Sequence, residues 1–293
     1  GSVLATALLL AWARVETVAG FYAVGAGLGL AMAALLYEPA FAVLAVWFRA
    51  RRGRALTALT FLGGCASVIF VPLAAAWVEA YGWRGALLRL ALVQAAATIP
   101  LHALLLRRRP QDHGWVPDGG APAPDDTAAR AERSVPAPVA VRSGSFRWIT
   151  ACFALSSLAT TAVAVHLVPL LLERGHPPAF AAAAMGMLGL MALPGRLVFT
   201  PLGDRWPRGA VTASIFVLQA AGAALLLAVS AAWAVWAFAA LFGAGFGAIT
   251  PARAALVAEL YGPAEYGRIS GVLALFTSLA RAAAPVGASL LHA

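Results

Sequence analysis

Four ionisable side chains of this chain stand inside long apolar stretches, where a charged group is costly. Glu38, His166, Arg253 and Arg281 are each flanked by apolar residues. A charge at the centre of a helix in a bilayer costs roughly 2.5–3.5 kcal/mol on insertion scales. Each group therefore needs a compensating partner, and solute binding or proton carriage would supply one.

Two of these groups, both arginines, could bind an anion. Arg281 lies about fourteen residues into its apolar segment, and Arg253 lies eight residues before Tyr261. Helical rise places the first near the middle of a bilayer and the second nearer one end. A guanidinium stays charged and forms paired hydrogen bonds with carboxylates. The alternatives are a structural ion pair with Glu38 or Glu259 or, for Arg253, a side chain that extends to the membrane surface.

Glu38 could carry a proton. It precedes Phe48 by ten residues, which corresponds to about 15 Å of helix and places the carboxyl group near the midplane. The alternatives are a carboxylate paired with an arginine and a carboxylate that contacts water. The adjacent Pro39 is expected to free a backbone carbonyl and to bend the helix. His166 stands near the outer end of its segment, as either a pH-sensitive gate or an interfacial anchor.

A second group of charges gathers at the end of one apolar segment. Arg196 and Asp204 are eight residues apart, so they share one face of a helix. Together with Arg205, Arg208 and Glu259 they could form a charge cluster that closes the inner side of the protein. The alternative is a set of loop charges that are solvated independently.

Several classes of chemistry are excluded by what the sequence lacks. It contains no Lys, so it cannot form the G-x-x-x-x-G-K-(S/T) loop that an ATP-driven pump requires. Its five His are scattered and form no H-E-x-x-H pattern, so we expect no metal, no cofactor and no enzymatic activity. The net charge of +9 comes from arginines in short loops, which argues against a nucleic-acid partner.

The elements that must position these residues are membrane-spanning helices. Apolar residues make up 62% of the chain and charged residues 11%, against about 25% charged residues in soluble domains. About 20 apolar residues cross the hydrocarbon core as a helix. The sequence therefore predicts an all-α polytopic membrane protein with about nine spans, the first too short to cross. The predicted spans are 2–13, 17–48, 55–79, 85–106, 147–172, 178–201, 209–230, 232–260 and 267–291.

Residues 107–146 interrupt this pattern. They begin with three arginines and continue through a Pro- and Ala-rich stretch that contains Asp125 and Asp126. This polar, aperiodic composition is typical of a flexible linker. It divides the chain into a first helical region, 1–106, with four spans and a second, 147–293, with five.

The arginines are distributed unevenly between the two sides of the predicted membrane. Alternating the loops places 14 arginines on the side of the linker and three on the other side. Positive residues concentrate in cytoplasmic loops. The linker 107–146 is therefore predicted to be cytoplasmic, and the chain to be a multi-pass protein of the plasma (inner) membrane.

One local motif resembles that of a known family. The segment Leu202–Arg208 reads Leu-Gly-Asp-Arg-Trp-Pro-Arg and resembles the cytoplasmic loop motif of the major facilitator superfamily, G-x-L-(G/A)-D-R-x-G-R-(R/K). Thr200, Pro207 and Gly209 depart from that pattern. Further resemblance to this family lies in Tyr37–Ala40, Gly82–Arg84 and Glu259–Gly262.

The resemblance implies a fold of two helical bundles. The nine spans then correspond to family helices 3 to 11, and helices 1, 2 and 12 are missing from the chain. The motif and its surroundings are expected to form a gate that closes the cytoplasmic side. The gate residues implied by the resemblance are Gly203, Asp204, Arg205, Arg208, Arg196 and Glu259.

The resemblance also implies transport of a small solute by alternating access, as a monomer in the lipid bilayer, either coupled to ions or protons or facilitated. The span 55–79 lacks the G-P-x-x-G-G run of drug–proton antiporters, which favours a small organic solute, anions especially. A multidrug/proton antiporter and a non-transporting membrane receptor are the alternatives. The expected substrate or coupling residues are Glu38, Arg281, Arg253 and His166.

Cysteine labelling tests the predicted orientation. In a background without Cys65 and Cys152, single cysteines at Arg51 and Arg205 are expected to react with an impermeant maleimide only from the cytoplasmic side, because both belong to the arginine-rich loops. The readout is labelling of sealed right-side-out and inside-out vesicles. Labelling of position 205 from the outside alone would reverse the topology.

Overall fold

The computed structural model describes residues 1–48, 51–106, 110, 115–119 and 134–292, and within these residues every regular element is a helix. The all-α prediction is confirmed. Most of the predicted linker, namely 107–109, 111–114 and 120–133, lies outside the described residues.

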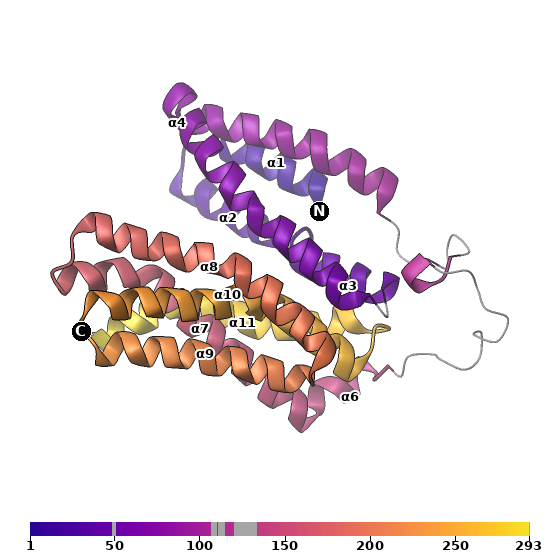
Figure 1. Ribbon diagram of the computed structural model, residues 1–293. Helices are drawn as coiled ribbons and strands as arrows, with labels where there is room; N and C mark the ends of the chain where they lie inside the picture. Colours follow the sequence, from indigo (N-terminus) through magenta and orange to yellow (C-terminus); the bar gives the residue numbers. More distant parts are fainter. Residues whose placement is uncertain (49–50, 107–109, 111–114, 120–133, 293) are drawn as a thin grey trace. The chain divides into compact units, whose positions relative to one another are not determined.

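The chain separates into two compact units (Figure 1). Unit 1 comprises Gly1–Trp47 and Leu62–Ala123, and unit 2 comprises Phe48–Phe61 and Pro124–Ala293. The long helix α4, Arg52–Leu105, contributes its first residues to unit 2 and the rest to unit 1. The division into bundles 1–106 and 147–293 stays a prediction.

Unit 1 is built from consecutive apolar helices. They are α1 (Ser2–Trp12), α2 (Val18–Ala33), α3 (Tyr37–Trp47), most of α4, and the 3-10 turn η2 (Pro117–Gly119). Thr17 begins α2 as its N-cap, because its side-chain oxygen accepts a hydrogen bond from the Gly20 N–H at 3.0 Å.

The predicted span 17–48 is divided into two helices, α2 and α3. The break at 34–36 comes just before Pro39, which lies in the first turn of α3. A proline there breaks no intrahelical hydrogen bond, whereas further along a helix it would remove one. A new helix start at Tyr37 therefore accommodates Pro39, and the bend expected at this proline becomes a break one turn earlier.

The predicted spans 55–79 and 85–106 both lie within α4. Gly82 interrupts the helical backbone with φ 69° and ψ 167°, a conformation that glycine adopts without the steric penalty of a Cβ. The interruption falls in the loop predicted between the two spans. In the described residues, seven helices are long and apolar enough to cross a membrane, with α2 and α3 counted together as Val18–Trp47, α4 counted once, and Ser2–Trp12 shorter. The number nine stays a prediction.

Unit 2 is built around a hydrophobic core. Its helices are α6 (Ala137–Arg142), α7 (Gly144–Glu173), α8 (Pro178–Arg205), α9 (Arg208–Ala228), α10 (Ala232–Tyr261) and α11 (Tyr266–His292). Helix α10 packs along both α8 and α9, and α7 packs along α11 (Figure 1). Phe238 and Phe242 of α10, Leu167 and Leu171 of α7 and Leu188 of α8 are buried together in this core.

The last part of the predicted linker is ordered against the turn between α10 and α11. The Val135 N–H donates to the Tyr261 carbonyl at 2.9 Å, and the Ala264 N–H donates to Ser134 Oγ at 3.2 Å. The Ala137 N–H, at the start of α6, donates to Glu265 Oε2 at 2.6 Å. Backbone groups at helix ends lack partners within their own helix, and here each of the two segments donates hydrogen bonds to the other. These bonds hold residues 134–142 against unit 2.

Candidate functional site

The backbones of α8 and α10 are in direct contact because glycines line their interface. An ideal Cβ at Gly195 would lie 2.0 Å from the Ala244 carbonyl oxygen, and one at Gly247 would lie 1.9 Å from that of Ala192. No side chain fits at such distances. Small residues at helix interfaces in membranes allow this close approach, and here they bring the side chain that follows Gly195 against α10.

That side chain is Arg196, and it binds two backbone carbonyls. Its Nε–H donates to the Gly247 carbonyl of α10 at 3.2 Å, and Nη1 donates to the Thr60 carbonyl of α4. Arg196 is half-buried, and Thr60 is fully buried. All three residues belong to unit 2. One guanidinium therefore connects α8, α10 and the beginning of α4.

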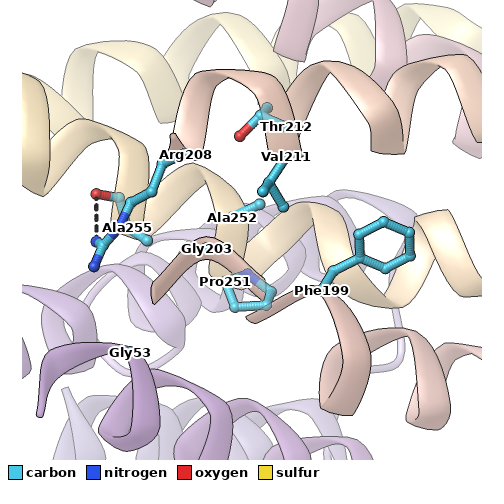
Figure 2. A pocket seen from close by; sticks show the side chains of 9 residues that line it. All are labelled: Gly53, Phe199, Gly203, Arg208, Val211, Thr212, Pro251, Ala252 and Ala255. Carbon is cyan, nitrogen blue, oxygen red and sulfur yellow. Dashed lines mark hydrogen bonds between the residues drawn. The ribbon is translucent and has the colours of Figure 1, made fainter. Parts of the chain in front are cut away.

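A second arginine connects α9 to α10. Arg208, the first residue of α9, places Nε 3.0 Å from Glu259 Oε2 and donates from Nη1 to the Ala255 carbonyl at 3.1 Å. Figure 2 shows the second contact. The Arg208 side chain is 18% exposed and that of Glu259 is 49% exposed. A pair this exposed contributes at most about 1 kcal/mol, so the ion pair orients the helix ends more than it stabilises the fold.

A small pocket lies beside this pair. Its cavity volume is only about 20 Å³, and it is lined mainly by apolar atoms from α8, α9 and α10, with Gly53 of α4 at one edge (Figure 2). Gly203 has no side chain, so only its backbone lines the pocket. An ideal Cβ at this position would lie 3.6 Å from Arg208 Cγ. The lining residues are Gly53, Phe199, Gly203, Arg208, Val211, Thr212, Pro251, Ala252 and Ala255.

The predicted gate residues therefore make separate contacts with different partners. Arg208 and Glu259 are brought together, whereas Arg196 is bound to backbone carbonyls of α10 and α4. Arg205 is exposed at the last position of α8. The side chain of Asp204 lies outside the part of the chain that is described.

Two of the predicted substrate residues lie on α10 and α11. Arg253 of α10 is half-buried and donates from Nη1 to Thr277 Oγ1 of α11 at 3.4 Å. Thr277 is 2% exposed and donates to the Ala274 carbonyl at 3.0 Å. Arg281 is exposed and follows Thr277 by one helical turn, so both lie on one face of α11. This places two cations and a hydroxyl group in one region of unit 2.

The other two predicted residues belong to other helices. His166 of α7 is half-buried, with Nε2 3.3 Å from the Pro285 carbonyl of α11. Glu38 is half-buried in the first turn of α3, in unit 1. In the described residues, no group of three or more His, Cys, Asp or Glu is placed to hold a metal ion.

The sequence did not predict the parts played by Thr60, by Thr277 and by the Pro251–Gly247 pair. The i, i+4 spacing of Thr277 and Arg281 was a readable signal, because such residues are neighbours on a helix. Proline at position 251 also indicated that the Gly247 carbonyl lacks its intrahelical donor. Nothing in the sequence indicated Thr60, whose carbonyl is a backbone group.

The fold and these contacts define a polytopic α-helical membrane protein whose charged residues tie helix ends together. Comparison with known families identifies the family of membrane proteins. Residues 1–285 match the family model described as the Major Facilitator Superfamily, and the chain belongs to this family. Since the relatives are transporters, the expectation that the chain is not an enzyme is confirmed.

One curated relative is monocarboxylate transporter 13 of Bos taurus, which is 30% identical over 233 residues. The alignment covers 78% of this chain and 51% of the relative, so the chain spans about half the length of that protein. Among solved structures, the fucose:proton symporter FucP of E. coli matches with a TM-score of 0.63 and 20% identity. That match covers 97% of this chain and 72% of the symporter, and it shows the fold.

The close packing of α8 on α10 predicts that a larger residue at position 247 lowers the stability of the protein. Gly247→Ala should destabilise the protein by at least about 1–3 kcal/mol, the typical cost of overpacking, because the new methyl group meets the Ala192 carbonyl. Thermal unfolding in detergent measures the change. Gly189→Ala, on the partner helix α8 with nothing within 4 Å of its Cβ, is the control and should be neutral or stabilising. Equal melting temperatures for the two variants would contradict the observed packing.

Proposed function

We propose that this chain is the transport domain of a secondary transporter that moves a small organic anion by alternating access, a short monocarboxylate being the favoured class. The observation that carries the proposal is the arrangement of Arg253, Thr277 and Arg281 on α10 and α11. Membership of the superfamily supports transport, and the name of the bovine relative supports a carboxylate.

The chemistry of the three side chains suits a carboxylate. A guanidinium binds the two carboxylate oxygens through parallel hydrogen bonds. Thr277 holds Arg253 at 3.4 Å, and Arg281 lies one turn further along the same face of α11. Two positive charges within one region compensate the charge of an anion and part of the cost of removing it from water.

We further propose that Glu38 carries a coupling proton. It stands at the start of α3 beside Tyr37, whose ring stacks on Phe41 at 5.3 Å. An ideal Cβ at Gly63 of α4 would lie 2.6 Å from the Tyr37 hydroxyl oxygen, so Gly63 makes room for that group. Glu38 itself is half-buried in an apolar helix. A carboxyl group inside a membrane segment is a candidate for carrying a proton.

The inner gate is proposed at the contact of α4, α8, α9 and α10 within unit 2. The Arg196–Thr60 contact and the Arg208–Glu259 pair hold helix ends around the pocket beside Gly203. Hydrogen bonds and one partly exposed ion pair can be exchanged for water at small free-energy cost. Such contacts can close the cytoplasmic side in one state and open in another.

The setting of this activity follows from the same reasoning. We propose that the protein acts as a monomer in the plasma (inner) membrane, with residues 107–146 in the cytoplasm between bundles 1–106 and 147–293. The arginine distribution of the sequence supports this orientation.

Ligand binding tests the anion site. Propionate should raise the melting temperature of the purified protein, whereas propionamide, which has the same shape without the charge, should not. Arg281→Ala should weaken propionate binding at least about 10-fold, since a charge-assisted hydrogen bond contributes about 1.5–3 kcal/mol. Microscale thermophoresis or isothermal titration measures the affinity.

The matched control is Arg89→Ala. Arg89 of α4 is also an arginine in an apolar helix, but it donates to the Gly85 carbonyl and stacks over the Tyr81 ring. Propionate affinity should be unchanged in this variant. Equal stabilisation by propionate and propionamide, or unchanged affinity in both Arg281→Ala and Arg253→Ala, would refute the site.

Proton coupling is tested at Glu38. Glu38→Gln should retain propionate binding but lose the pH dependence of uptake, because the amide keeps the shape of the carboxyl group and cannot exchange a proton. The measurement is uptake of labelled propionate at several pH values in cells that express the whole transporter. Unchanged pH dependence in Glu38→Gln would show that another group carries the proton.

A further inference from the structure

The carbonyl group of Gly247 needs a hydrogen-bond donor from outside its own helix. In an α-helix this carbonyl would accept from the backbone N–H four residues later, but that residue is Pro251, which has none. Both residues are buried inside α10. In apolar surroundings an unsatisfied carbonyl is costly, and prolines in membrane helices are tolerated where neighbouring groups supply the missing bond.

Arg196 supplies that bond, and the local sequence explains why it can. It follows Gly195, and Gly195 and Gly247 together bring α8 and α10 into backbone contact. At this separation the Nε–H of Arg196 lies 3.2 Å from the Gly247 carbonyl oxygen. The guanidinium has five N–H donors in a fixed plane, so Nη1 remains available for a second acceptor, the Thr60 carbonyl.

The acceptor on α4 is equally well placed. Thr60 is fully buried, and its hydroxyl group donates to the carbonyls of Leu56 at 2.8 Å and Thr57 at 3.2 Å. Its side chain is thus engaged with its own helix, and its backbone carbonyl accepts from Arg196. Arg196 therefore contacts backbone on both sides, and neither acceptor is a carboxylate.

We propose that Arg196 is a positioning residue that replaces the hydrogen bond lost at Pro251 and, with the same guanidinium, holds the beginning of α4 against α8 and α10. We expect the contact with Gly247 to persist, because Pro251 offers no N–H to that carbonyl. The contact with Thr60 is the exchangeable half, and its part in gating rests on the function proposed above.

A double-mutant cycle without any solute tests the hydrogen bond between Arg196 and the Gly247 carbonyl. Pro251→Ala gives residue 251 an N–H and so restores the intrahelical bond to Gly247. Arg196→Met removes all donors while keeping an unbranched chain. Arg196→Met should raise the equilibrium constant for unfolding at least about 10-fold in the natural background, and clearly less in the Pro251→Ala background. Denaturation by sodium dodecyl sulfate in mixed micelles measures both.

Pro169→Ala provides the matched control. It also replaces a proline inside a helix, α7, but at a position whose freed carbonyl belongs to Val165. In that background the effect of Arg196→Met should remain at full size. If Arg196→Met alone does not fold, recovery of folded protein by Pro251→Ala and not by Pro169→Ala supports the proposal equally. Equal effects in all three backgrounds would overturn it, whatever the protein transports.

The contact between Arg196 and the Thr60 carbonyl is tested separately. A cysteine at Gly203, beside the pocket, should react with a maleimide several-fold faster in Arg196→Met/Pro251→Ala than in Pro251→Ala alone, because α4 is no longer held at Thr60. Arg196→Lys/Pro251→Ala should be intermediate, since an ammonium group can reach one carbonyl. An unchanged rate would overturn the role of Arg196 in holding α4, and loss of propionate binding by the natural protein would instead count against the proposed function.

Discussion

The constraint on which the rest of this structure depends is that every backbone N–H and C=O in an apolar environment needs a partner. Prolines inside the helices disturb that balance at known positions, and at Pro251 the disturbance is repaired by a side chain from α8. The repair requires a long cationic donor and two glycines that let the helices touch. Sequence features that look separate, a proline in one helix and a Gly-Arg pair in another, are thus one physical unit.

The same constraint explains how helix ends are held. The Tyr261 carbonyl, the Ala264 N–H and the Ala137 N–H lie at helix ends, and each finds its partner in the opposing segment. Arg174 likewise donates to the Leu226 carbonyl at the end of α9, at 2.7 Å. These contacts replace water with protein groups at little net free energy. Their effect is to fix which segments lie together, which burial of apolar surface alone does not do.

Five arginines of unit 2 form two groups. Arg174, Arg196 and Arg208 donate to backbone carbonyls and join helices. Arg253 reaches a threonine hydroxyl, with Arg281 one turn further along the facing helix. An arginine bound to carbonyls contributes to architecture, whereas a pair of cations around a hydroxyl group can recognise an anion. These two arginines are the basis for the proposal that α10 and α11 bind the solute.

The sequence by itself determined the class of fold. Apolar runs and scarce charges required membrane helices, and the Leu202–Arg208 motif indicated the family that the comparison confirmed. It also selected Arg196, Arg208 and Glu259 as important. Only the tertiary structure decided their partners, because Arg196 and Gly247 are 51 residues apart and Arg196 and Thr60 are 136 apart. Periodicity shows which face a residue occupies, but which backbone lies against that face depends on how glycines and prolines let the helices approach.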